Sequence, residues 1–164
     1  MTKKTPDELL AELLDREAIR DLPACYCDCV WRGDVDGLVE LFTEEGAFVI
    51  RSSEGETRVE GRVALKEFYR VGLRHQQRPL IHNVVVELRA ADRASGRAYL
   101  DIRSAKHNYE LMGAGHYADE YRKLGGRWYF ESRIFTAVRL DEGPGSAKTR
   151  STAASAARRV RRAH

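Results

Sequence analysis

The hydrophobic periodicity of the chain changes at Pro79, and this change constrains the fold more than any other feature of the sequence. Most of the chain before Pro79 carries apolar residues at spacings of three and four, whereas the residues after it alternate between apolar and polar. The alternating part divides into segments of strand length at hairpin spacing, over residues 80–91, 97–107, 113–124 and 127–140. Helices followed by a long antiparallel sheet predict an α+β fold, in which the helices cover one face of a curved sheet and enclose a mostly apolar pocket.

The part before Pro79 predicts helices and one short hairpin. The sequence Thr5–Glu8 has the form of a capping box, so a helix is expected to begin near residue 6. Helical spacing continues to Arg32, with a kink or break expected at Pro23. Gly33-Asp34 then predicts the end of that helix and the start of a short second one. A hairpin over residues 47–60 leads into a third helix.

Length and composition indicate one globular domain followed by a basic tail. The chain has 164 residues, of which 43% are hydrophobic and 32% charged. The net charge of +3 is located at the C-terminus, where residues 141–164 hold six Lys or Arg against two acids. That segment is too polar to be buried, so residues 1–140 are expected to form the domain and residues 141–164 a disordered tail. Short basic termini are more often solvated than bound to nucleic acid, which is therefore not the expected partner.

The sequence also predicts a cellular compartment and a redox state. It has no apolar signal segment and no run long enough to cross a bilayer, so we expect a cytoplasmic protein without a membrane partner. Cys25, Cys27 and Cys29 form the thiol cluster of the chain. Helical spacing turns Cys27 away from the other two, so neither a metal site nor a disulfide is expected, and the thiols should be reduced.

His82 is the first candidate for chemistry. It lies in the clearest strand pattern of the chain, Ile81–Leu88, where alternation places it on the same face as Val84 and Val86. An imidazole at the edge of an apolar surface can serve as a general base or acid near neutral pH. A core histidine that is hydrogen-bonded to the backbone would give the same pattern.

Signatures in a fixed order resemble the SnoaL-like branch of the NTF2-like superfamily. They are Arg16–Leu22 in the long helix, Arg32–Leu38 at the helix corner, His82 on the first long strand, and the hairpin Gly115–Arg133. The branch includes scytalone dehydratase, hexachlorocyclohexane dehydrochlorinase and bile-acid 7α-dehydratase, and more distant members include ketosteroid isomerase and the small subunits of ring-hydroxylating dioxygenases. The resemblance implies a cone-shaped α+β barrel with a deep pocket, usually in homodimers or homotrimers, and no cofactor.

The resemblance also implies catalytic positions. In the dehydratase and dehydrochlorinase members, a His at the start of this strand and an Asp near the end of the long helix remove a proton while a leaving group departs. His82 matches the His, but Trp31 occupies the position of the Asp. Asp28, one helical turn earlier, or Asp101, on the neighbouring strand, could supply a carboxylate instead. Asp28 could equally pair with Arg32, and Asp101 with a strand arginine.

Further residues are candidates for substrate binding. Tyr26 matches a tyrosine on the pocket side of the long helix, and Tyr117 lies on the hairpin where substrate-facing groups are found in the family. His107 lies near the second histidine of scytalone dehydratase. Each phenol could hold a substrate oxygen or pack in the core. Arg133 follows Trp128 at the family spacing and could close the pocket or, as we expect, pair with a helix acid.

These residues support a leading hypothesis and an alternative. The first is a cofactor-independent lyase or isomerase of the dehydratase type, which acts on a small hydrophobic cyclic substrate such as a steroid, a polyketide or an aromatic catabolite. His82 would be the base, and Asp28 or Asp101 would orient it. The alternative is a non-catalytic ligand-binding or structural protein that has lost the Asp–His pair. Trp31 favours this alternative, because an indole cannot accept a hydrogen bond from imidazole.

Overall fold

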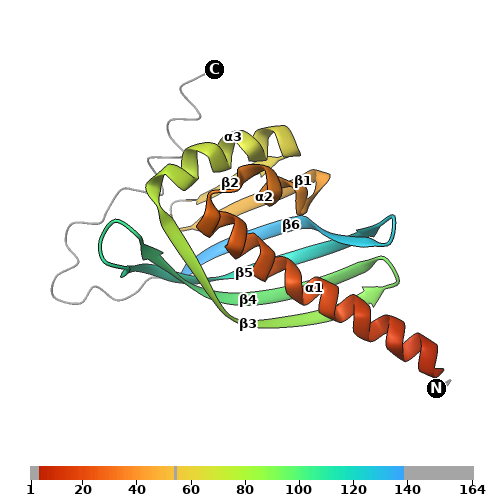
Figure 1. The fold of residues 1–164 in the computed structure, drawn as a ribbon. Coiled ribbons are helices and arrows are strands. Elements are labelled where there is room, and N and C mark those ends of the chain that lie inside the picture. Colours follow the sequence, from red (N-terminus) through yellow and green to blue (C-terminus); the bar gives the residue numbers. More distant parts are fainter. Residues whose placement is uncertain (1–3, 54, 139–164) are drawn as a thin grey trace.

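The computed structural model describes residues 4–53 and 55–138, and it confirms the α+β class (Figure 1). The helices α1 and α2 come first, a hairpin and α3 follow, and four long strands complete the described chain. The elements are α1 (Pro6–Arg32), α2 (Val35–Glu40), β1 (Phe42–Ser52), β2 (Gly55–Glu60), α3 (Arg62–Gly72), the 3-10 turn η1 (Leu73–His75), β3 (Gln77–Ala90), β4 (Arg93–Ser104), β5 (Glu110–Leu124) and β6 (Arg127–Val138).

The six strands form one sheet in the order β2-β1-β6-β5-β4-β3. All neighbours are antiparallel except β1 and β6, which run parallel. The sheet is curved, and β2 and β3 form its two edges, so the expected cone is not closed into a barrel by strand pairing. The helices lie together on one side of the sheet, and α1 crosses it obliquely (Figure 1). The core therefore lies between this layer of helices and the concave face of the sheet.

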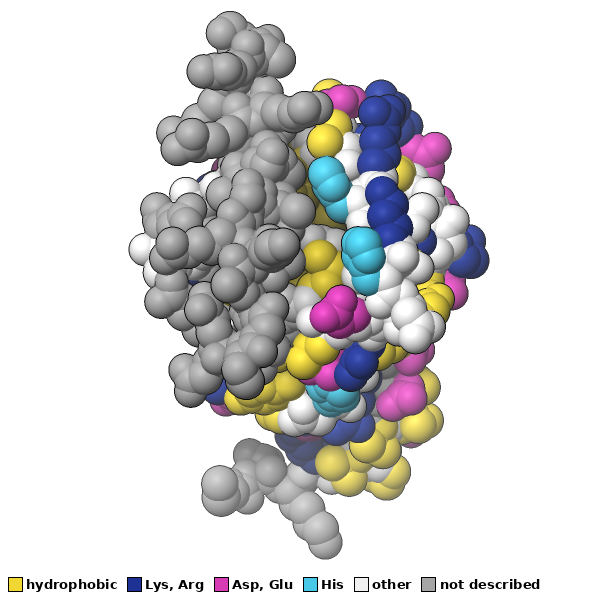
Figure 2. All heavy atoms as spheres, turned by 90° about the vertical axis from the view of Figure 1, so that its left-hand side faces the viewer, with side chains coloured by type: hydrophobic (Ala, Val, Ile, Leu, Met, Phe, Trp, Pro, Cys, Tyr) yellow, Lys and Arg dark blue, Asp and Glu magenta, His cyan; other side chains and the backbone are white. Residues whose placement is uncertain are grey.

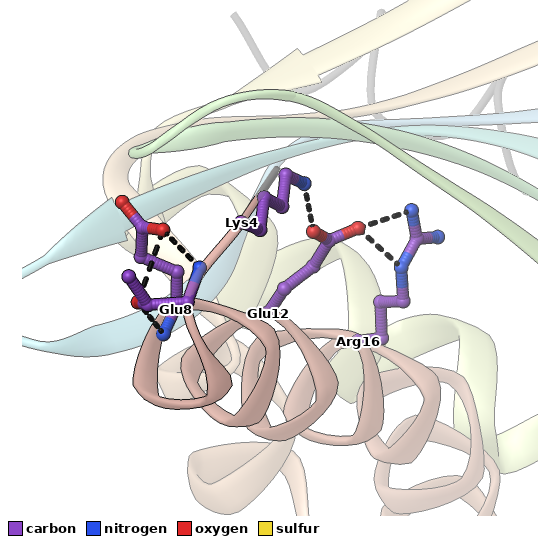
Figure 3. Close-up of polar contacts among 5 residues, drawn as sticks. Lys4, Glu8, Glu12 and Arg16 are labelled. Carbon is purple, nitrogen blue, oxygen red and sulfur yellow. Dashed lines mark hydrogen bonds and ion pairs between the residues drawn. The ribbon is translucent and has the colours of Figure 1, made fainter. Parts of the chain in front are cut away.

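The first helix begins as the sequence predicts but is not interrupted. Thr5 caps its start, and the Glu8 carboxylate accepts a hydrogen bond from the Thr5 backbone N–H, which completes the capping box (Figure 3). One turn after Glu8, the carboxylate of Glu12 pairs with both Lys4 and Arg16 (Figure 3). The helix then passes through Pro23 and continues to Arg32, where Gly33 ends it with a φ of 71°.

Tertiary packing explains why Pro23 does not break α1. Pro23 itself is buried, and so are Ile19, Leu22 and Tyr26 around it. The apolar contacts on both sides of the proline hold the two halves of the helix against the sheet and offset the missing backbone hydrogen bond. The N-terminal turns differ, because their leucines are exposed (Leu9, Leu10, Leu13 and Leu14) and these turns extend past the edge of the sheet (Figure 1).

Several strand boundaries differ from the sequence-based expectation because of irregular pairing. The segment Thr43–Gly46, expected as a turn, belongs to β1, and the pairing register with β6 shifts between Phe42 and Ala47. The turn between β3 and β4 is shorter than expected, so β4 already begins at Arg93. At its other end β4 stops at Ser104. A local alternation pattern shows that strands exist, but cross-strand pairing decides where they begin and end.

The basic tail, residues 141–164, lies outside the described residues. Within residues 4–53 and 55–138, no helix is both long and apolar enough to cross a membrane.

Two glycines on β5 offer a stability test of the β5–β6 packing. A Cβ at Gly115 would lie 2.4 Å from the carbonyl oxygen of Thr136 and 2.7 Å from the Phe135 ring, whereas nothing lies within 4 Å of a Cβ at Gly113. We expect Gly115→Ala to lower the free energy of unfolding by about 1–3 kcal/mol, because the strands must separate to fit the methyl group. Gly113→Ala should change it by less than about 0.5 kcal/mol. Urea denaturation of both variants measures the difference, and equal effects would contradict the close β5–β6 approach.

Candidate functional site

Arg133 on β6 is the centre of the candidate site. Its side chain is 0% exposed, although arginine is among the residues least often buried. Three aromatic rings surround the guanidinium carbon, at centroid distances of 3.7 Å for Tyr117, 4.3 Å for Tyr26 and 4.5 Å for Phe130. Contacts of this kind stabilise a cation electrostatically through the negative faces of the rings. Helix α1 and strands β5 and β6 thus form an aromatic cage around one positive charge.

Asp119 on β5 is the counter-ion of Arg133. The two residues are paired across the β5–β6 register, both side chains are fully buried, and Nε of Arg133 lies 3.3 Å from Oδ1 of Asp119. The Tyr121 hydroxyl donates a hydrogen bond to the other carboxylate oxygen, at 3.0 Å. Burial raises the pKa of Asp119 to about 6, against the opposing effect of Arg133 and the Tyr121 hydrogen bond. This carboxyl is therefore mostly ionised at pH 7 and protonated in mild acid.

Arg133 stays positively charged although it is buried. Burial by itself would lower the pKa of this guanidinium, but the neighbouring Asp119 carboxylate and the surrounding phenols raise it above its ordinary value. Arg133 is thus a permanent cation inside the protein. The expected partner was a helix acid, and this expectation is wrong, because the acid comes from the adjacent strand.

The buried ion pair leaves hydrogen-bonding capacity unused. Within the described residues, none of the Arg133 nitrogens makes a hydrogen bond, and neither does Oδ1 of Asp119. Buried polar groups are hydrogen-bonded in the great majority of cases, and a buried charge without hydrogen bonds is costly. The N–H groups of Arg133 are therefore strong donors without an acceptor among the described residues.

Phenol groups lie around this cation. Tyr26 donates to the hydroxyl of Tyr69, a residue of α3, at 3.2 Å, and its ring makes edge contacts with the rings of both Tyr69 and Tyr117. Burial raises the pKa of all three phenols above the ordinary value. They therefore stay neutral over the physiological pH range and act as hydrogen-bond donors, not as bases.

The three cysteines diverge as helical spacing predicts. Cys27 is half-buried and lies near Arg133, and burial raises the pKa of its thiol to about 11. Cys25 is exposed and Cys29 is buried on another side of α1, and all three are free thiols. Among the described residues no group of three or more His, Cys, Asp or Glu side chains could hold a metal ion.

His82 does not lie on the core face, and the expected alternation is wrong at this point. His82 and Asn83 lie between the paired positions Ile81↔Leu100 and Val84↔Ala98, so two residues of β3 stand opposite one residue of β4. This β-bulge turns His82 outward, where its side chain is 53% exposed.

The carboxylate beside His82 comes from the neighbouring strand. The His82 imidazole lies 3.4 Å from Asp101, which in turn lies 3.5 Å from Arg103. His82 was expected to be a base inside a pocket. It belongs instead to a cross-strand cluster of charged residues on the solvent side of β3 and β4. Figure 2 shows histidine side chains on the face that is turned towards the viewer.

The expected helix acid, Asp28, does not face the cage. Its exposed carboxylate pairs with Arg32, 2.7 Å away, at a surface pocket of about 460 Å³ between the end of α1 and α2. Trp31 lies about one helical turn further along; its indole N–H donates to the carbonyl of Pro79 at 2.9 Å and its ring stacks on Tyr109. Trp31 thus ties α1 to the start of β3 and to the β4–β5 turn.

Of the remaining candidates, two belong to the cage and one does not. Tyr26 and Tyr117 are both buried and contact Arg133. His107 lies in the turn after Ser104 and is exposed, because β4 ends before reaching it. Its expected position on a strand is therefore wrong.

Sequence reasoning missed Asp119 and Tyr69. The first could have been found, because alternation along β5 places Asp119 on the same face as Tyr117 and Tyr121. A carboxylate flanked by two tyrosines on a core-facing strand pattern is an unusual signal. Tyr69 lies one turn after Leu65 on α3, and only packing shows that its hydroxyl reaches Tyr26.

Comparison with known proteins establishes the family. Residues 11–134 match the SnoaL-like domain. The chain belongs to this family. A search of curated proteins finds no significant match.

Solved structures share the fold over nearly the whole domain. Rv3472 of Mycobacterium tuberculosis, described as a protein of unknown function, is 28% identical with a TM-score of 0.77, covering 94% of each chain. An NTF2-like protein with a cystatin-like fold from Novosphingobium aromaticivorans is 20% identical with a TM-score of 0.70, covering 88% of this chain and 96% of the other. LinA is 19% identical with a TM-score of 0.69, covering 83% and 94%. The last two likenesses show the fold alone.

The buried ion pair of this SnoaL-like protein can be tested through stability. Arg133→Met keeps the volume but leaves the Asp119 carboxylate buried without a counter-ion, so we expect the free energy of unfolding at pH 8 to fall by about 3 kcal/mol or more. The loss should shrink as the pH falls towards 6, because the carboxyl, without the guanidinium that lowers its pKa, is protonated at a higher pH than in the wild type.

The matched control for this test is the double variant Arg133→Met, Asp119→Asn, which contains no buried charge. It should recover much of the lost stability and show no such pH dependence. Urea denaturation between pH 6 and 8 measures both effects. A single variant as stable as the wild type at pH 8 would show that the core does not depend on the pair.

Proposed function

We propose that the protein binds a small, mostly apolar organic acid between its helices and the concave face of the sheet, with Arg133 holding the acidic oxygen. The observation that carries this proposal is the buried guanidinium whose nitrogens make no hydrogen bond within the described residues. A planar guanidinium with free N–H groups matches the geometry of a carboxylate and can bind it through two parallel hydrogen bonds.

The surroundings of Arg133 favour a ligand that combines one anionic group with an apolar body. The rings of Tyr26, Tyr117 and Phe130 surround the guanidinium, and the neutral phenol of Tyr117 adds a group that can donate to a further oxygen of the ligand. Small-molecule sites typically pair a mostly apolar lining with a few placed polar groups. Membership in the SnoaL-like family is compatible with this proposal but does not decide it, because one fold hosts many functions.

A His-based mechanism has less support. His82 is half-exposed and pairs with Asp101 on the solvent side of the sheet, while Asp28 pairs with Arg32 on the surface. Neither arrangement points a base at the aromatic cage. The alternative interpretation of the sequence, a non-catalytic ligand-binding protein, therefore fits the geometry better, because the His82–Asp101 pair lies outside the cage.

Calorimetric titration with a panel of small carboxylic acids tests the binding proposal. We expect aromatic and alicyclic monocarboxylates to bind, and their amides, which lack the charge, to bind at least tenfold more weakly. Arg133→Lys keeps the charge but loses the planar fork, so its affinity should fall by roughly one to two orders of magnitude.

The control for that titration is His82→Ala, which should bind with the wild-type affinity, because His82 lies outside the cage. Thermal unfolding checks that both variants are folded. Equal affinity of Arg133→Lys and the wild type for the acids would remove Arg133 as the anion-binding group.

A second candidate function is a cofactor-independent isomerase or lyase in which Asp119 is the base. It is favoured by one observation: Oδ1 of Asp119 is buried and accepts no hydrogen bond from the described residues, and it lies beside neutral phenols that could hold an enolate oxygen. With a neutral cyclic ketone, Oδ1 would take the proton from the carbon next to the carbonyl. The C–H electron pair would form the enolate double bond, and the carbonyl pair would move to an oxygen bound by Tyr117 or Arg133.

Exchange of ketone α-protons for solvent deuterium, followed by NMR, tests this reaction. The rate should rise with pH through about 6, because the base must be unprotonated, and it should be lost in Asp119→Asn. His82→Ala should keep the wild-type rate. Undiminished exchange in Asp119→Asn would exclude Asp119 as the base.

A further inference from the structure

The proposed ligand and Asp119 would have to share one guanidinium. Asp119 is 3.3 Å from Arg133 and both side chains are fully buried, so they are in contact without solvent between them. Aromatic rings cover Arg133 on several sides. An anion bound to the free N–H groups of Arg133 would therefore lie within a few ångströms of the Asp119 carboxylate.

Two carboxylates beside one buried cation leave a net negative charge in the interior. Such a charge is expensive at low dielectric, and a group that can neutralise itself by taking up a proton does so. When two carboxylates share a buried site, the pKa of one of them is strongly raised.

Asp119 is the group that can respond near neutral pH. The charged and titratable groups around it are Arg133 from β6, Tyr117, Glu120 and Tyr121 from β5, Tyr26 and Cys27 from α1, and Tyr69 from α3. The buried phenols and the Cys27 thiol stay protonated, since burial raises the pKa of each. Glu120 is exposed on the other face of the strand.

We propose, on the basis of the proposed function, that an anionic ligand replaces Asp119 as the counter-ion of Arg133 and that each binding event adds one proton to Asp119. The pair acts as a charge filter that accepts monoanionic oxyacids and discriminates against dianions and neutral analogues. Asp119 is then a specificity-determining residue of the site.

The hydrogen-bond geometry accommodates the protonated form. Oδ2 of Asp119 already accepts a hydrogen bond from Tyr121, and Oδ1 has no hydrogen-bond partner in the described part of the chain. A proton on Oδ1 would leave the Tyr121 bond in place and give the carboxyl an O–H that donates to the ligand carboxylate. Such charge-assisted bonds are short and strong.

The proposal has a defined pH dependence. Without ligand the pKa of Asp119 is about 6, and the bound anion raises it further. Between the pKa of Asp119 in the free protein and its higher pKa in the complex, the affinity should fall by up to about tenfold for each unit of rising pH, because one proton is taken up for each ligand. Below about pH 6 the uptake should vanish, since Asp119 is already protonated.

Titration calorimetry of the full chain at pH 7, in two buffers with different ionisation enthalpies, counts the protons directly. The probes are benzoate and cyclohexanecarboxylate, which are ionised throughout this pH range, with phthalate as the dianion and benzamide as the neutral analogue. We expect an uptake close to one proton for each monoanion bound, and at least tenfold weaker binding of phthalate and benzamide.

Asp119→Asn should take up no proton, and its affinity for benzoate should be independent of pH. The matched control is Glu120→Gln, the adjacent acid on the opposite face of β5, which should keep the wild-type uptake. Thermal unfolding verifies that both variants are folded. If Asp119→Asn is not, the pH dependence of wild-type affinity decides by itself, and a flat profile between pH 6 and 8 overturns the proposal.

The outcomes separate this inference from the proposed function. Binding of the monoanions without proton uptake overturns the inference and leaves the binding function intact. Uptake that persists in Asp119→Asn also overturns it, because another group would then take the proton. If no monoanion binds at millimolar concentration, the binding function fails and the inference fails with it.

Discussion

The contact between Arg133 and Asp119 is the interaction on which the rest of the structure depends. A buried ion pair carries a large desolvation cost, and here the close contact, a hydrogen bond from Tyr121 to Asp119 and three aromatic faces around the cation offset part of it. These contacts require the β5–β6 register that places the two residues opposite each other. A slip of β6 by one residue would turn Arg133 to the other face of the sheet, away from Asp119, and destroy the cage.

The helices complete this arrangement. Helix α1 supplies Tyr26 and α3 supplies Tyr69, and the hydroxyl contact between them links the two helices above the sheet. The cage is therefore assembled from elements far apart in the sequence.

The location of the chemistry is where sequence reasoning and structure diverge most. His82 was a reasonable choice, because strand alternation and the family position both placed it in a pocket. One extra residue in β3 reverses that conclusion, since a bulge turns the side chain to the other face. Conversely, the alternation along β5 already places Asp119 between two tyrosines on the core side. Its pairing with Arg133 depends on the β5–β6 register, which local alternation does not give.

The sequence by itself determined the element types, the α+β class, the family resemblance and the capped start and end of α1, because periodicity and capping are properties of neighbouring residues. It also singled out Tyr26, Tyr117 and Arg133 as candidate residues. Only the tertiary structure decided the parallel pairing of β1 with β6, the outward turn of His82 and the partner of Arg133. These depend on contacts between residues distant in the chain, which no local pattern encodes.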